Sequence, residues 1–150
     1  MRSHTPFLDQ KYATPSSTSR APATRLFLAL SGAIITIIGG LILFVPHAFH
    51  AANHIELGTQ PNLLSEVRVP GGIFLALGLV IIAGAFRSRF REIALITCAL
   101  AFGMTGLSRL VSLMFDGIPT GSILAALAIE LIVAAIALSC LATHSGRTAN

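Results

Sequence analysis

The sequence predicts an all-α protein, a polytopic transmembrane four-helix bundle with antiparallel up-down topology. Of its 150 residues, 54% are hydrophobic and only 11% are charged, which is more apolar surface than an ordinary soluble domain needs. Most of the chain is made of four apolar runs, each bounded by a polar segment. Because a membrane span has no water to satisfy its backbone, each run is expected to be a helix.

The four runs divide the chain into a membrane domain with two tails. They cover Leu26–Val45, Gly71–Phe86, Ile93–Phe115 and Ser122–Ala142. A span needs about 20 apolar residues at 1.5 Å each, and the second run reaches that length only if it begins near Ser65. We therefore expect a four-helix transmembrane domain over residues 26–142. Residues 1–25, rich in Ser, Thr, Pro and Arg, are expected to be a disordered cytoplasmic tail, and residues 143–150 a short cytoplasmic tail.

The basic residues predict the orientation of the chain. Only one basic residue, Arg68, lies in the first predicted outer loop, whereas the two tails and the link between the second and third runs hold Arg2, Lys11, Arg20, Arg25, Arg87, Arg89, Arg91 and Arg147. The positive-inside rule places both termini in the cytoplasm. This distribution also explains the net charge of +4 without nucleic acid, so membrane lipids are the expected partners. The chain could also form a homo-oligomer or join a larger membrane complex, and the sequence leaves this open.

Two charged residues, Arg109 and Glu130, lie inside the third and fourth runs. A charge at bilayer depth is costly unless it is paired or reached by water. Arg109 lies about two turns before the outer end of its helix, and Glu130 about 15 Å from the outer end of the next helix. Since side chains lean toward the N-terminus of their helix, the two charged groups converge on one depth and can form a charge-assisted pair. Ser108 and Ser112 could extend such a network.

The pair supports two interpretations. In the first, it fixes the register of the helices, and the protein is a structural or accessory membrane module; we favour this interpretation. In the second, a polar pocket in the outer half of the bundle binds or transports a small polar molecule, a lipid headgroup or protons. The candidate residues of that pocket are Glu66, Arg68, Arg109, Asp116 and Glu130. A dry contact between the paired groups would favour the first interpretation, and a wet cavity the second.

Small residues at four-residue spacing indicate close packing between helices. Gly32, Thr36 and Gly40 form one such stripe, and Ala99 with Gly103 another. The glycines expected at helix contacts are Gly32, Gly40, Gly71, Gly72, Gly78 and Gly103. Such stripes are common in membrane bundles, so they support the fold and say little about function.

The first outer loop holds three histidines, His47, His50 and His54, whose spacing would place them on one face of a helix. Such a face could present metal ligands. Interfacial histidines are commoner, and Pro46 and Asn53 argue against a continuous helix, so we expect no metal and no other cofactor. The chain has no catalytic motif of the nucleotide-binding, nucleophile-elbow, zinc-protease or haem-attachment type. We do not expect an enzyme, although a membrane enzyme using these histidines is a third possibility.

The order of several short elements resembles a known family. The segment Asn62-Leu-Leu-Ser-Glu-Val-Arg-Val-Pro-Gly-Gly72 is followed by Gly78, by Gly106-Leu-Ser-Arg-Leu110 with Asp116-Gly-Ile-Pro119, and finally by Glu130. This pattern, over about residues 26–142, is similar to the bacterial four-helix membrane family called domain of unknown function 4345. The resemblance implies the bacterial inner membrane as the location. It also implies that Glu66, Arg68, Gly71, Gly72, Arg109, Asp116 and Glu130 match the polar and glycine positions of the family.

Overall fold

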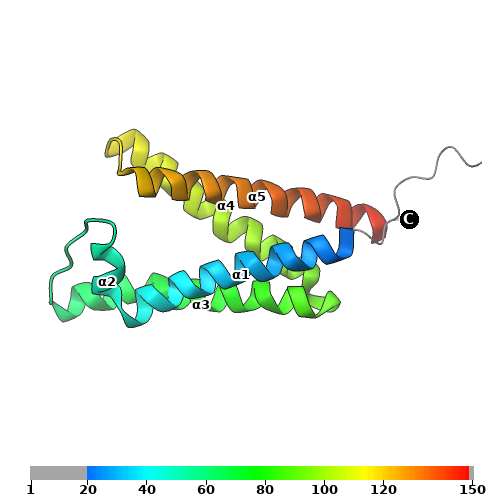
Figure 1. Cartoon of the computed structure of the whole chain (residues 1–150), viewed down its shortest axis with the longest axis horizontal. Coiled ribbons are helices and arrows are strands. Elements are labelled where there is room, and N and C mark those ends of the chain that lie inside the picture. The colour runs from blue at the N-terminus through cyan, green and yellow to red at the C-terminus, as the bar shows by residue number, and fades with distance from the viewer. Residues whose placement is uncertain (1–19, 149–150) are drawn as a thin grey trace, which may run out of the picture.

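In the computed structural model, residues 20–148 are described, with side chains for residues 22–143. This part of the chain is helical and contains no strand, which confirms the all-α prediction. Between residues 20 and 148 the chain forms four long helices, a short helix and a single 3-10 turn, and Figure 1 shows how the helices are arranged. Their bounds are α1 (Arg20–Phe44), α2 (Pro46–Ala51), α3 (Pro61–Phe86), η1 (Ser88–Phe90), α4 (Arg91–Phe115) and α5 (Gly121–Thr148).

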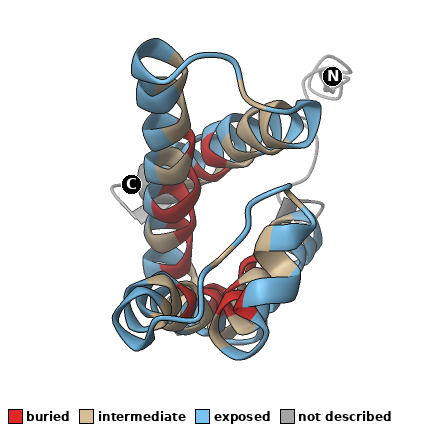
Figure 2. Ribbon diagram, turned by 90° about the vertical axis from the view of Figure 1, so that its left-hand side faces the viewer, coloured by how far each residue is buried: buried red, intermediate tan, exposed pale blue. Residues whose placement is uncertain are grey.

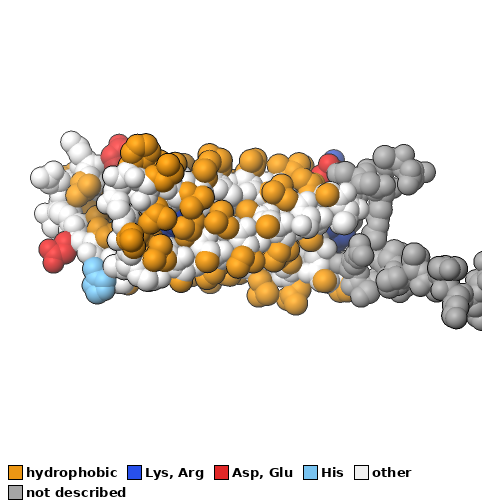
Figure 3. Space-filling model, turned by 90° about the horizontal axis from the view of Figure 1, so that it is seen from above, with side chains coloured by type: hydrophobic (Ala, Val, Ile, Leu, Met, Phe, Trp, Pro, Cys, Tyr) orange, Lys and Arg blue, Asp and Glu red, His pale blue; other side chains and the backbone are white. Residues whose placement is uncertain are grey.

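Each long helix contains a segment long and apolar enough to cross a membrane. The segments are Pro22–Phe44, Pro61–Phe86, Ser88–Phe115 and Gly121–Thr143. The second begins four residues before Ser65, so it has the length that a span requires. Figure 3 shows hydrophobic side chains along the body of the molecule and most of the visible charged side chains near its two ends, with a basic side chain among the hydrophobic ones. The chain is therefore a small multi-pass membrane protein.

The helices differ from the expected boundaries at both ends of the membrane domain. Helix α1 begins at Arg20, inside the segment expected to be a tail, and α5 continues to Thr148. Residues 1–19 of the expected N-terminal tail lie outside the described residues. Pro46 and Pro61 are the first residues of α2 and α3, where the absence of a backbone N–H leaves no hydrogen bond unmade.

Helices α1 and α3 run side by side (Figure 1), and glycines allow them to pack closely. A Cβ built on Gly32 would lie 3.0 Å from the carbonyl oxygen of Gly78, and one built on Gly39 would lie 2.7 Å from that of Gly71. As residue numbers increase along α1, the facing residue numbers on α3 decrease. The backbones of the two helices are therefore in direct contact along this interface. Such close approach is the usual reason for small residues between membrane helices.

The predicted set of packing glycines needs correction. Gly32, Gly71 and Gly78 lie in the α1–α3 contact. Among the described residues, nothing outside its own helix lies within 4 Å of a Cβ built on Gly72, and Gly40 has only the end of the Leu75 side chain at 3.9 Å. A built Cβ on Gly103 would make an ordinary contact with Ala134 at 3.7 Å. The contact on α1 continues through Gly39 instead of Gly40 because a helix has 3.6 residues per turn, so a strict four-residue spacing drifts off the face.

The second pair of helices, α4 and α5, diverges from the first. Helix α4 packs on α3 and on α5, whereas α1 and α4 have few contacts. In Figure 1 the two pairs lie close together where α1 begins and α5 ends, and they separate toward α2 and the α4–α5 turn. The buried core includes Leu28, Ile81, Leu95, Cys98 and Ala137, which all lie in the closed half. Figure 2 shows these buried segments where helices face each other. In the opposite half the two pairs of helices enclose a wedge-shaped space, which side chains fill in part and which contains the cavity described below.

Candidate functional site

The open wedge contains a cavity of about 360 Å³ between α1, α2 and α3 on one side and α4 and α5 on the other. We call it the interhelical cavity. Its walls are mostly apolar, and its polar lining comprises His50, Asn53, Thr105, Arg109, Ser122 and Glu130. Apolar walls with a few convergent polar groups are typical of ligand sites.

Arg109 and Glu130 form an ion pair inside this cavity. The Nε of Arg109 donates to both carboxylate oxygens of Glu130, at 3.0 Å to Oε1 and 2.9 Å to Oε2. The contact is possible because Gly106, one turn before Arg109, lets α5 approach; its built Cβ would lie 3.0 Å from Leu131 and 3.6 Å from the Cβ of Glu130. A single donor, Nε, thus serves both carboxylate oxygens of this charge-assisted pair.

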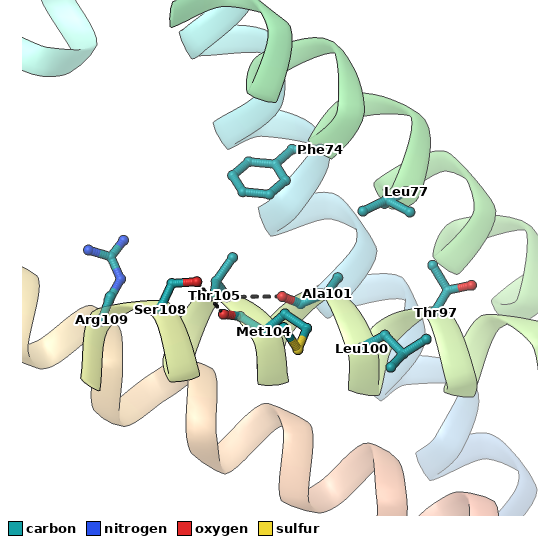
Figure 4. A pocket seen from close by; sticks show the side chains of 9 residues that line it. All are labelled: Phe74, Leu77, Thr97, Leu100, Ala101, Met104, Thr105, Ser108 and Arg109. Atoms are coloured by element: carbon teal, nitrogen blue, oxygen red, sulfur yellow. Dashed lines mark hydrogen bonds between the residues drawn. The ribbon is translucent and has the colours of Figure 1, made fainter. Parts of the chain in front are cut away.

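The two members of the pair differ in exposure. The side chain of Glu130 is 13% exposed, and that of Arg109 is 37% exposed. Figure 4 shows the terminal nitrogens of Arg109 directed away from the α4 backbone, on the side where Phe74 projects from α3. The guanidinium is therefore the more exposed member of the pair. Its Nε is bonded to the carboxylate, and its terminal nitrogens point away from α4.

The mouth of the cavity is bordered by α2 and the start of α5. His50 Nδ1 lies 2.8 Å from the carbonyl oxygen of Pro46, and Ser122 Oγ lies 3.4 Å from Asn53 Oδ1. The second contact joins the loop after α2 to the first turn of α5 across the wedge. The sequence did not predict Asn53, Ser122 or Thr105 as site residues, although all three line the cavity. No spacing in the sequence indicates that α2 turns back over the end of the bundle.

The five residues of the predicted polar pocket do not come together. Only Arg109 and Glu130 line the interhelical cavity. Glu66 is exposed on α3, and Asp116 is exposed and accepts a hydrogen bond from Ser112 Oγ at 2.9 Å. Asp116 follows the last residue of α4, about 10 Å from Arg109 along the helix axis. Ser112 and Ser108, which donates to the Met104 carbonyl, therefore bond locally and not to the pair.

Arg68 has a structural contact instead. Its guanidinium donates to the carbonyl oxygen of Leu43 in the last turn of α1. The last carbonyls of a helix lack intrahelical donors, and an arginine from a neighbouring helix can satisfy one of them. Arg68 lies on the face of α3 that continues to Gly71 and Gly78, which explains why it points to α1 and not to the cavity.

Replacing Arg68 with leucine is expected to lower the free energy of unfolding by about 1–3 kcal/mol, because a carbonyl at the end of α1 loses its charged donor. Reversible unfolding in mixed micelles, followed by circular dichroism, measures the change. Arg89, exposed in the η1 turn, gives the control: Arg89→Leu should change stability far less. Equal losses in the two variants would contradict the role assigned to Arg68.

The three histidines do not form the metal-binding face considered from the sequence. Helix α2 ends at Ala51, and His54 lies beyond it with a left-handed backbone conformation at φ 61°. Within residues 20–148, no group of three or more His, Cys, Asp or Glu side chains is placed to hold a metal ion. A common face for the three histidines required one continuous helix through His54, and the helix ends before that residue.

Fold and site define the class of this molecule: a small helical membrane protein with an ion pair in an interhelical cavity. The family model described as "Domain of unknown function (DUF4345)" matches residues 23–141. The chain belongs to this family, as its sequence pattern indicated. No curated protein and no solved structure matches the chain.

Proposed function

We propose that this protein is a membrane-embedded binding module that holds a polar group of its ligand at Arg109 in the interhelical cavity. The observation that supports this most directly is the position of the guanidinium. It is held through Nε by Glu130, it is 37% exposed, and it lines the cavity. A pair that only fixed helix register would be better served by a closed contact, because a charge left partly open at bilayer depth adds cost without adding stability.

The proposal includes an orientation. With both termini and the η1 turn in the cytoplasm, as the positive-inside rule favours, the mouth of the cavity at α2 and the α4–α5 turn opens to the other side of the membrane. In the bacterial inner membrane this would be the periplasmic side. A polar ligand would then enter from that side or from its leaflet.

Cysteine accessibility tests whether the cavity is wet. Ala126 lines the cavity on α5, whereas Ala128 is exposed on the same helix and lines no cavity described here. In membranes, we expect Ala126→Cys to react with a water-soluble charged thiol reagent above the level of the unsubstituted protein. Ala128→Cys, facing lipid, should not. Adding the reagent to only one side of sealed vesicles also reports the orientation.

Failure of Ala126→Cys to react from either side, while the variant melts at the parent temperature, would mean a dry interior. The structural or accessory role would then be the better account of the pair.

A further inference from the structure

A groove on the outer surface of the bundle leads to the same guanidinium. It has a volume of about 590 Å³ and lies between α3 and α4. We call it the α3–α4 groove. Figure 4 shows Phe74 and Leu77 projecting from α3 over the face of α4 that carries Thr97, Leu100, Ala101 and Met104. Its lining is mainly apolar up to Ser108 and Arg109 at one end.

The lining of the groove matches an amphiphile, with an apolar stretch and a charged group at one end. From Thr97 to Arg109 it follows α4 for about 18 Å. Among the described residues that line it, Arg109 alone is charged. Arg109 also lines the interhelical cavity, so the groove and the cavity meet at the guanidinium. One end of the groove therefore offers hydrogen-bond donors with positive charge, and the rest offers a surface for a hydrocarbon chain.

The donor geometry selects the ligand's polar group. Glu130 occupies the Nε edge of the guanidinium, and the terminal nitrogens point away from α4 (Figure 4). Arginine fits phosphate well, because two of its N–H groups can donate to two phosphate oxygens at once. A phosphate bound at the terminal nitrogens would lie across the guanidinium from Glu130, which limits the repulsion between the two anions.

The depth of Arg109 suits a lipid. Helix α4 has 25 residues, a length of about 37 Å, and exceeds the hydrocarbon core of about 30 Å. Arg109 lies six residues before the end of α4, about 9 Å along the helix. With α4 centred on the hydrocarbon core, the Cα of Arg109 would lie within the core, about 5 Å from the outer headgroups. Local thinning of the bilayer, which commonly accompanies a membrane arginine, would bring a lipid phosphate within its reach.

We propose that the α3–α4 groove holds a membrane phospholipid, whose chain lies along Leu77, Leu100 and Met104 and whose phosphate accepts hydrogen bonds from the terminal nitrogens of Arg109. This inference rests on the proposed function and names the ligand class for that site.

Native mass spectrometry of the detergent-solubilised full chain tests the proposal. The probes are dioleoylphosphatidylglycerol and dioleoylglycerol, which share their chains and differ in the phosphate headgroup. We expect the phospholipid to bind at least tenfold more tightly than dioleoylglycerol. Arg109→Gln should remove this difference, and Ala101→Leu, which fills the floor of the groove, should weaken phospholipid binding several-fold. Ala128→Leu makes the same change on the lipid-facing side of α5 and should bind as the parent does.

Equal binding of the two probes by the parent protein would overturn the proposal. Displacement of the lipid by an equimolar amount of glycerol phosphate would also overturn it, because the chain would then contribute nothing. If Arg109→Gln does not fold, Arg109→Lys keeps the charge but loses the planar fork, and unchanged affinity in that variant would contradict the geometry proposed for the phosphate.

The outcome also separates this inference from the proposed function. If the lipid loses affinity in Arg109→Gln but not in Ala101→Leu, the polar site stands and the groove assignment fails. If the parent binds neither probe while Ala126→Cys is labelled from water, the cavity is a site for another polar ligand. If the parent binds neither probe and Ala126→Cys is unlabelled, both proposals fail.

Discussion

Replacement of Arg109 by leucine is expected to lower the free energy of unfolding by about 3 kcal/mol or more, because it leaves the mostly buried carboxylate of Glu130 without its charged partner. Glu130, 13% exposed, accepts from Arg109 through both of its oxygens. An ordinary hydrogen bond between membrane helices contributes only about 0.6 kcal/mol. The expected loss therefore comes mainly from the charge left unpaired, and only in small part from the bond removed.

The reverse change, Glu130→Leu, should cost less, about 1–2 kcal/mol. The arginine that it leaves is 37% exposed, and a long basic side chain can carry its charge toward water or headgroups. The double variant Arg109→Leu with Glu130→Leu removes both charges and should be milder than the sum of the two single changes. Unfolding in mixed micelles gives the four free energies of the cycle. A double variant as damaging as that sum would show that the two residues act independently.

The composition and the four apolar runs were sufficient to predict the all-α membrane fold, because hydropathy and span length constrain a helix in lipid strongly. The pairing of Arg109 with Glu130 could also be anticipated, since helix geometry relates sequence distance to depth along two consecutive spans. What depth could not supply was azimuth, the direction in which a residue points around its helix. From the sequence, Glu66, Arg68 and Asp116 were expected in the same outer half of the bundle as the pair. None of their side chains lines the interhelical cavity.

The interhelical cavity depends on features that no local pattern encodes. It exists because the α1–α3 and α4–α5 pairs separate toward one end of the molecule (Figure 1), and because α2 turns back so that His50 and Asn53 border the opening. Helix crossing angles depend on the combined shapes of facing side chains. The sequence therefore indicated a polar interior but not the residues around its mouth.

Two adjacent glycines of α1 allow a direct test of the helix contact. Gly39 faces α3, where a built Cβ would lie closest to the backbone nitrogen of Leu75 and 2.7 Å from the carbonyl oxygen of Gly71. Gly40 points elsewhere, with only the end of the Leu75 side chain at 3.9 Å. Gly39→Ala should therefore lower the free energy of unfolding by about 2–3 kcal/mol, because rigid backbone must move to admit one methyl group.

Gly40→Ala, which adds the same methyl group one residue away, should be neutral or stabilising by up to about 1 kcal/mol, since alanine favours the helix over glycine. The two variants have the same composition, so hydrophobicity and membrane insertion are matched. The difference between their unfolding free energies then reports which side of α1 meets α3. If the helices instead met through the four-residue stripe that includes Gly40, the order of the two variants would be reversed. That result would contradict the close approach of the α1 and α3 backbones at Gly39, where a built Cβ lies 2.7 Å from the carbonyl oxygen of Gly71.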